Sequence, residues 1–218
     1  MFRVILYSHW KWSRLIVALG SVAGFALPIV SLQGAASGDR SALAAGELLQ
    51  AVQSWGVLYP VLAAGLGLLV AITTWAPDHR GRHVHALSLP VPRWRYVALR
   101  FGAGTALLAA PIVAVVAGAL LATWSATIPP GLQGYPVALA VRFALAVLVA
   151  YAVFFAVSAG TARTAGIILG ILGSIILVQI LAGVANLELD LFGRLQVIVL
   201  DWPGPLAIFT GRWMLIDV

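Results

Sequence analysis

Basic side chains gather in one polar segment, residues 75–100, which lies between two long apolar stretches. It holds three of the four histidines and a single carboxylate, Asp78. Asp78 can serve as a helix N-cap by accepting backbone N–H bonds, and Pro90 and Pro92 stop a helix that continues to about Leu89. The pattern predicts a short helix in water between two membrane spans. Its arginines are Arg80, Arg82, Arg93, Arg95 and Arg100.

Two histidines of this segment, His79 and His83, are four residues apart, so both imidazoles would share one face of a helix and could bind a metal. Asp78 lies beside them, but the sequence supplies no obvious further ligand. We therefore favour a basic surface that contacts lipid phosphate or a protein partner. We expect no metal site and no cofactor in this chain.

Besides Thr73 and Thr74, two polar residues inside the apolar stretches stand out, Arg142 and Gln179. Arg142 lies about 9 Å inside a predicted span, where it either extends to the lipid headgroups, pairs with Glu188 or Asp190, or meets an anionic substrate. Gln179 most simply bonds a neighbouring helix, because the bilayer offers no water. Both are candidates for residues that line a transport pathway.

Several chemistries are excluded. There is no cysteine, and the single lysine, Lys11, is followed by Trp12, so no phosphate-binding G-x-x-x-x-G-K-[ST] loop exists. No span carries paired carboxylates or a chain of Asp, Glu or His that would relay protons. The hydrolase patterns G-x-S-x-G and H-E-x-x-H are also missing. We expect no catalytic residues and no enzyme activity in the chain itself.

Composition places the chain in a membrane. Of its 218 residues 62% are hydrophobic and 9% charged, against roughly 25% charged residues in soluble domains. The net charge of +6 sits beside apolar stretches and not on a folded polar face, so we expect no nucleic-acid partner. The pattern is typical of an all-α, polytopic helical bundle in contact with lipid.

The apolar stretches predict five spans. An amphipathic helix over Phe2–Arg14 comes first, with Arg3, Tyr7, Lys11 and Arg14 on one arc and Phe2, Ile5, His9 and Trp12 opposite, which suits the membrane interface. A loop with Asp39, Arg40 and Glu47 follows the first span, and a turn at Ile128–Gly131 follows the third. The predicted spans are Leu15–Leu32, Trp55–Ala76, Arg93–Trp124, Tyr135–Ser158 and Thr164–Val184.

In this arrangement the N-terminus, the polar segment and Arg163 share one side of the membrane and hold nine of the 13 basic residues. The other side holds six of the seven carboxylates. The positive-inside rule then predicts a cytoplasmic N-terminus and a multi-pass protein of the cytoplasmic (inner) membrane.

Two glycine patterns concern helix packing. Gly20-x-x-x-Gly24 and Gly166-x-x-x-Gly170 let helix backbones approach closely.

Residues 185–218 contain charged residues and Pro203-Gly204-Pro205, which rule out a simple span. We therefore expect two short helices, broken at the prolines, that lie on or dip into the outer face.

The polar segment, with a helix before the first span, resembles permease subunits of ABC transporters of the type-2 exporter class. In that family an acidic residue, a glycine and a leucine-rich stretch closing in Pro-x-x-Arg precede the third span. Asp78, Gly81, Leu87, Leu89, Pro90 and Arg93 take these places here. The family usually has six spans, and this sequence stops where the sixth would begin, so either the sequence is truncated or the protein lacks that span.

The resemblance implies an ATP-driven exporter in which ATP and Mg²⁺ bind a separate ATPase subunit and a second permease subunit, identical or not, completes the transporter. Residues 77–97 would form the coupling loop, and the helix over residues 1–14 the interfacial elbow, with Arg3, Lys11, Trp12 and Arg14. The residues implied to contact the ATPase are Asp78, His79, Arg80, Gly81, Arg82, Leu87, Leu89, Pro90, Arg93 and Arg95.

Two other interpretations remain open. The chain could be a structural or assembly subunit of a larger membrane complex, which need not bind an ATPase. It could instead be a haem-export permease, although all four histidines fall on the predicted cytoplasmic side, away from the external face where a haem ligand would be expected.

Overall fold

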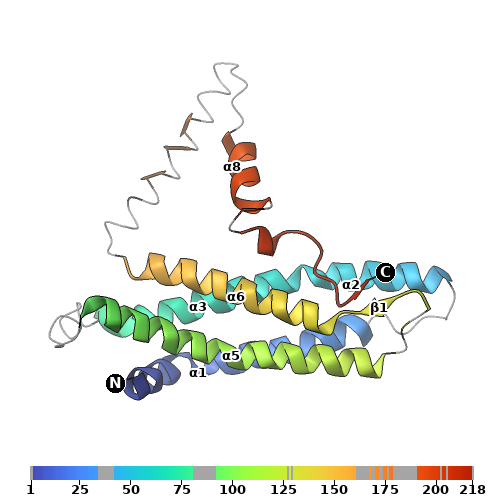
Figure 1. Ribbon diagram of the computed structural model, residues 1–218, viewed down its shortest axis with the longest axis horizontal. Coiled ribbons are helices and arrows are strands. Elements are labelled where there is room, and N and C mark those ends of the chain that lie inside the picture. The colour runs from blue at the N-terminus through green and yellow to red at the C-terminus, as the bar shows by residue number, and fades with distance from the viewer. Residues whose placement is uncertain are drawn as a thin grey trace. The chain divides into compact units, whose positions relative to one another are not determined.

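The computed structural model describes residues 2–33, 42–80, 92–126, 128, 130–160, 167, 170–171, 174–175, 177–178, 191–201, 203–204 and 206–217 (Figure 1). The chain divides into two compact units, which we describe separately. The first comprises residues 1–155 and 212–218, and the second residues 156–211.

The first unit is a bundle of helices. Four described stretches are long and apolar enough to cross a membrane: Phe2–Gln33, Leu48–Ala76, Arg93–Ser125 and Pro136–Ser158. The predicted third and fourth spans are thereby confirmed as helices to within one residue. The predicted fifth span, 164–184, lies largely outside the described residues. The helices of the bundle are α1 (Phe2–Gln33), α2 (Ala42–Gly56), α3 (Leu58–Arg80), α5 (Arg93–Ser125) and α6 (Pro136–Ser158).

Helix α1 is one uninterrupted helix of 32 residues. The predicted division at Arg14, between an interfacial helix and a span, is therefore wrong. No proline precedes Pro28 in this helix, and extending a helix gains a hydrogen bond per residue whereas starting a new one is costly. At 1.5 Å per residue α1 is about 48 Å long, so roughly a third of it exceeds a 30 Å apolar layer.

Two predictions around α2 and α3 also need correction. Part of the predicted loop after the first span is helical, because α2 begins at Ala42 and contains Glu47. Helix α3 continues to Arg80, so Asp78 lies inside its last turn and is not the N-cap of a separate helix. Continuing the α3 hydrogen bonds again costs less than nucleating a new helix.

Small residues bring the helices together, and α1 and α5 form the most extensive pair (Figure 1). A Cβ on Gly118 would overlap the carbonyl oxygen of Phe25, and one on Gly24 would press against Val115. A Cβ on Gly20 would overlap the side chain of Leu66 in α3. The prediction that Gly20 and Gly24 permit close helix approach is confirmed, whereas Gly170 has nothing within 4 Å of its Cβ position and Gly166 is not described.

The segment 212–217, called the C-terminal segment below, returns to the bundle at the N-terminal end of α6. Strand β1 (Gln133–Gly134) pairs antiparallel with β2 (Ile216–Asp217), with Gln133 opposite Asp217. The N–H of Tyr135 donates to the carbonyl of Leu215 at 2.8 Å. The predicted turn before the fourth span is present at residues 130–131, where Gly131 has φ of 95°.

In the second unit, α8 (Leu191–Leu200) is followed by one 3₁₀ turn, η1 (Ala207–Phe209). The hydroxyl of Thr210 bonds the carbonyl of Leu200 at 3.1 Å and so ties the two together. One short helix and one 3₁₀ turn thus lie on either side of Pro203 and Gly204, where we predicted two short helices, and their placement on the outer face stays a prediction.

Candidate functional site

A buried arginine of the polar segment joins α3 and α5, the two helices that contain the ends of this segment. Arg100, two turns into α5, is only 6% exposed and donates from Nη1 to the carbonyl oxygen of Thr74 in α3 at 2.7 Å. Its guanidinium carbon lies 5.2 Å from the ring centre of Trp75 and 5.0 Å from that of Tyr96. We call these four residues the Arg100 clamp. A desolvated cation–π contact is worth about 2 kcal/mol, so the clamp holds the end of α3 firmly on the start of α5.

The clamp is extended by aromatic rings from α5 and α6. The indole N–H of Trp75 donates to the carbonyl of Phe155 at 3.2 Å, and their rings are 5.2 Å apart. Phe101 contacts both Tyr151 and Phe155, with ring centres 5.2 and 5.3 Å apart. Edge-to-face and offset pairs of this kind add about 0.5–1.5 kcal/mol each. Three helices are therefore fixed together next to the polar segment.

The structure shows only part of the predicted ATPase-contacting set. Arg93 and Arg95 are exposed in the first turn of α5. Asp78, His79 and Arg80 occupy the last turn of α3, but their side chains lie outside the described part of the structure. The other members of the set lie outside the described residues altogether: Gly81, Arg82, Leu87, Leu89 and Pro90.

The predicted elbow residues lie on the first half of α1, where Arg3, Lys11, Trp12 and Arg14 are all exposed. The opposite side of this half packs inward at His9 and Ser13, which are 2% and 1% exposed. The cationic face is therefore available to headgroups, although the helix that carries it is continuous with the first span.

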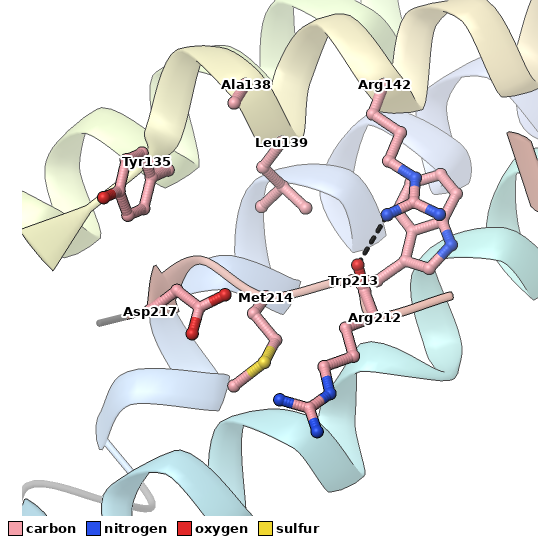
Figure 2. A pocket seen from close by; sticks show the side chains of 8 residues that line it. All are labelled: Tyr135, Ala138, Leu139, Arg142, Arg212, Trp213, Met214 and Asp217. Atoms are coloured by element: carbon pink, nitrogen blue, oxygen red, sulfur yellow. Dashed lines mark hydrogen bonds between the residues drawn. The ribbon is translucent and has the colours of Figure 1, made fainter. Parts of the chain in front are cut away.

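Arg142, the candidate pathway residue, lies at a second site. Its Nη1 donates to the carbonyl oxygen of Arg212 at 2.5 Å, and its guanidinium carbon lies 4.5 Å from the ring centre of Trp213 (Figure 2). Trp213 in turn stacks on Tyr59 of α3 at 6.3 Å. Arg142 thus attaches the C-terminal segment to α6. Glu188, Asp190 and the other candidate, Gln179, lie outside the described residues.

A cavity of about 280 Å³ opens beside Arg142 (Figure 2). It is polar at several points of its wall and apolar between them, so it suits a small amphipathic group. We call it the Arg142 pocket. Its lining residues are Tyr135, Ala138, Leu139, Arg142, Arg212, Trp213, Met214 and Asp217.

Metal chemistry has no support among the described residues, which include no group of three or more His, Asp or Glu side chains able to hold an ion. His83, one half of the pair weighed as a metal site, lies outside them.

Sequence reasoning singled out Arg142 but missed its partner Trp213, which is 71 residues away and carries no local signal. It also left Arg100 out of the candidate site. An arginine placed two turns inside an apolar helix was the available signal, because such a cation needs partners within the protein.

Replacing Arg142 with glutamine is expected to loosen the C-terminal segment without unfolding the bundle. The substitution removes a charge-assisted hydrogen bond and a cation–π contact, together about 2 kcal/mol. Hydrogen exchange at the Tyr135 amide, which donates to Leu215, should accelerate about tenfold or more. The amides of the Arg100 clamp serve as the internal control, and equal acceleration there would show that the effect is global.

Comparison with known proteins finds no matching family model, no matching curated protein and no matching solved structure.

Proposed function

We propose that this chain is the membrane-spanning permease subunit of an ATP-driven transporter of the ABC exporter class, working with a separate ATPase and a second permease subunit. The Arg100 clamp is the observation that carries the proposal. An ATP-driven membrane subunit that lacks a nucleotide-binding loop receives work from an ATPase partner. Receiving work requires a surface on which the partner acts and a rigid connection from that surface to the membrane spans.

Two features of the described residues support this proposal. Arg93 and Arg95 provide an exposed cationic surface at the start of α5, while α5 continues for 33 residues into the bundle. At about 50 Å this helix is longer than a bilayer core of about 30 Å, so its first turns project into water. Because Arg100 bonds α3 as well, a displacement of residues 81–91 would move both flanking helices together.

The excess of basic residues at this end supports a cytoplasmic location for it and hence for the N-terminus. ATP and Mg²⁺ would bind only the partner. The direction of export and the presence of a second permease subunit rest on the family resemblance.

The test is co-purification of the tagged chain in mild detergent. We expect a nucleotide-binding ATPase to accompany it, and the double charge reversal Arg80→Glu plus Arg82→Glu to reduce the recovered ATPase about tenfold or more. The matched control is Arg40→Glu plus Arg194→Glu, which makes the same change of charge on the predicted opposite side and should leave recovery unchanged.

Two results would overturn the proposal. If no ATPase accompanies the wild-type chain and other membrane subunits do, the chain is a structural or assembly subunit. If both double variants lose the ATPase equally, the ATPase responds to the overall positive charge of the chain and does not bind specifically at the polar segment.

A further inference from the structure

The Arg142 pocket combines two cationic side chains from distant parts of the chain with one carboxylate. Arg142 comes from α6, whereas Arg212 and Asp217 come from the C-terminal segment (Figure 2). Its formal charge is therefore +1. The bond to the Arg212 carbonyl and the Trp213 ring hold the Arg142 guanidinium at the cavity wall, and the Arg212 side chain is exposed.

The volume of the cavity limits what it can hold. At about 280 Å³ it lies just below the range of about 300–1,000 Å³ that is typical of ligand pockets. This space suits a headgroup with one phosphate but not a whole lipid or a large solute. Guanidinium groups match phosphate oxygens in geometry and charge.

The helix that carries Arg142 also exposes apolar side chains, each one residue before a pocket-lining position or its helical repeat and so about 100° round the helix from it. On α6 the residues Val137, Val141 and Leu145 are 65%, 53% and 47% exposed. They follow one another at the helical spacing of four, so they form a stripe along the helix that also carries Arg142. A molecule with a phosphate in the pocket would place hydrocarbon chains on this stripe.

We propose that the Arg142 pocket binds the phosphodiester headgroup of an anionic membrane phospholipid, whose acyl chains lie on the Val137, Val141 and Leu145 stripe. The net charge of such a lipid, which is −1 for phosphatidylglycerol, balances the +1 charge of the pocket, whereas the choline of a zwitterionic lipid would bring a further cation to the two guanidinium groups. This inference is independent of the ATPase partner, since it rests only on the pocket and the adjoining stripe. The bound lipid would also bridge α6 and the C-terminal segment.

The test measures lipid retained by the purified full-length chain after exchange into nanodiscs or detergent containing defined mixtures of phosphatidylglycerol and phosphatidylcholine. Native mass spectrometry counts the bound molecules. We expect the wild-type chain to prefer phosphatidylglycerol, and Arg212→Gln to lower that preference about tenfold, as expected for the loss of one charge-assisted hydrogen bond. Arg212→Lys keeps the charge and should retain most of the preference.

The matched control is Arg194→Gln, which removes an exposed arginine that does not line the pocket. An equal loss in this variant, or no loss in Arg212→Gln, would overturn the proposal. Soluble glycerol phosphate and inorganic phosphate provide the second arm. If either compound displaces phosphatidylglycerol at low millimolar concentration, the acyl chains contribute nothing to binding and the pocket is a site for a soluble anion. That result would also overturn the proposal.

Discussion

The substitution Gly118→Ala is expected to destabilise the bundle by about 3 kcal/mol, at the upper end of the range for overpacking. Gly118 lies where α5 crosses α1, and a Cβ there would overlap the Phe25 carbonyl oxygen and come within 3.0 Å of its Cα. Backbone atoms of a helix cannot move aside as a flexible side chain can. The two helices would therefore have to separate, and their contact is the largest in the bundle.

The measurement is unfolding in a titration with denaturing detergent, followed by the helical circular dichroism signal. Gly102→Ala is the matched control, because it is on the same helix and the nearest atom to its Cβ position is on Phe2 at 3.9 Å. We expect the control substitution to leave the stability of the bundle unchanged or to raise it by up to about 1 kcal/mol, because alanine has a better helix propensity than glycine. Equal midpoints for the two variants would mean that α1 and α5 do not pack at Gly118.

The second large effect is expected at the Arg100 clamp. Arg100→Met retains a long side chain but removes the hydrogen bond to Thr74 and the cation–π contacts with Trp75 and Tyr96. The combined loss is about 3 kcal/mol, since a hydrogen bond from a charged group contributes about 1.5–3 and a desolvated cation–π contact about 2, with incomplete additivity.

The same unfolding titration measures this loss. The stability of Arg100→Lys should fall between those of the wild-type chain and Arg100→Met, because an ammonium keeps the charge but lacks the planar group that stacks on the rings. Arg93→Met is the matched control on the same helix, where the arginine is exposed and the expected change is below about 0.5 kcal/mol. If Arg100→Met resembles this control, the clamp does not stabilise the bundle and the proposed link from the polar segment to the spans loses its support.

The loss of the clamp also separates stability from function. If the proposed ATPase partner is recovered with the wild-type chain, an Arg100→Met variant that folds and retains this ATPase but no longer couples its hydrolysis to transport would support Arg100 as the proposed link. A folded variant that loses the ATPase would instead support an effect on the proposed contact surface at Arg93 and Arg95.

The sequence alone determined the long helices of the bundle. The ends of α5 and α6 were predicted to within one residue because a long apolar run and the prolines around it act through local hydrogen bonding and hydrophobicity. The same local signals predicted the turn at residues 130–131. They wrongly placed a division at Arg14 within α1, a loop where α2 begins, and the start of a new helix at Asp78 within α3, because a composition change does not stop a helix that gains a bond with every added residue.

Only the tertiary structure decided which polar groups meet. Sequence spacing marked Arg142 as unusual but gave no sign that its guanidinium would stack on Trp213, or that strands β1 and β2, more than 80 residues apart, would pair beside it. It likewise did not show that Arg100 reaches across to Thr74. Such contacts depend on how whole helices pack, and packing is fixed by many weak non-local interactions with no periodic trace in the sequence.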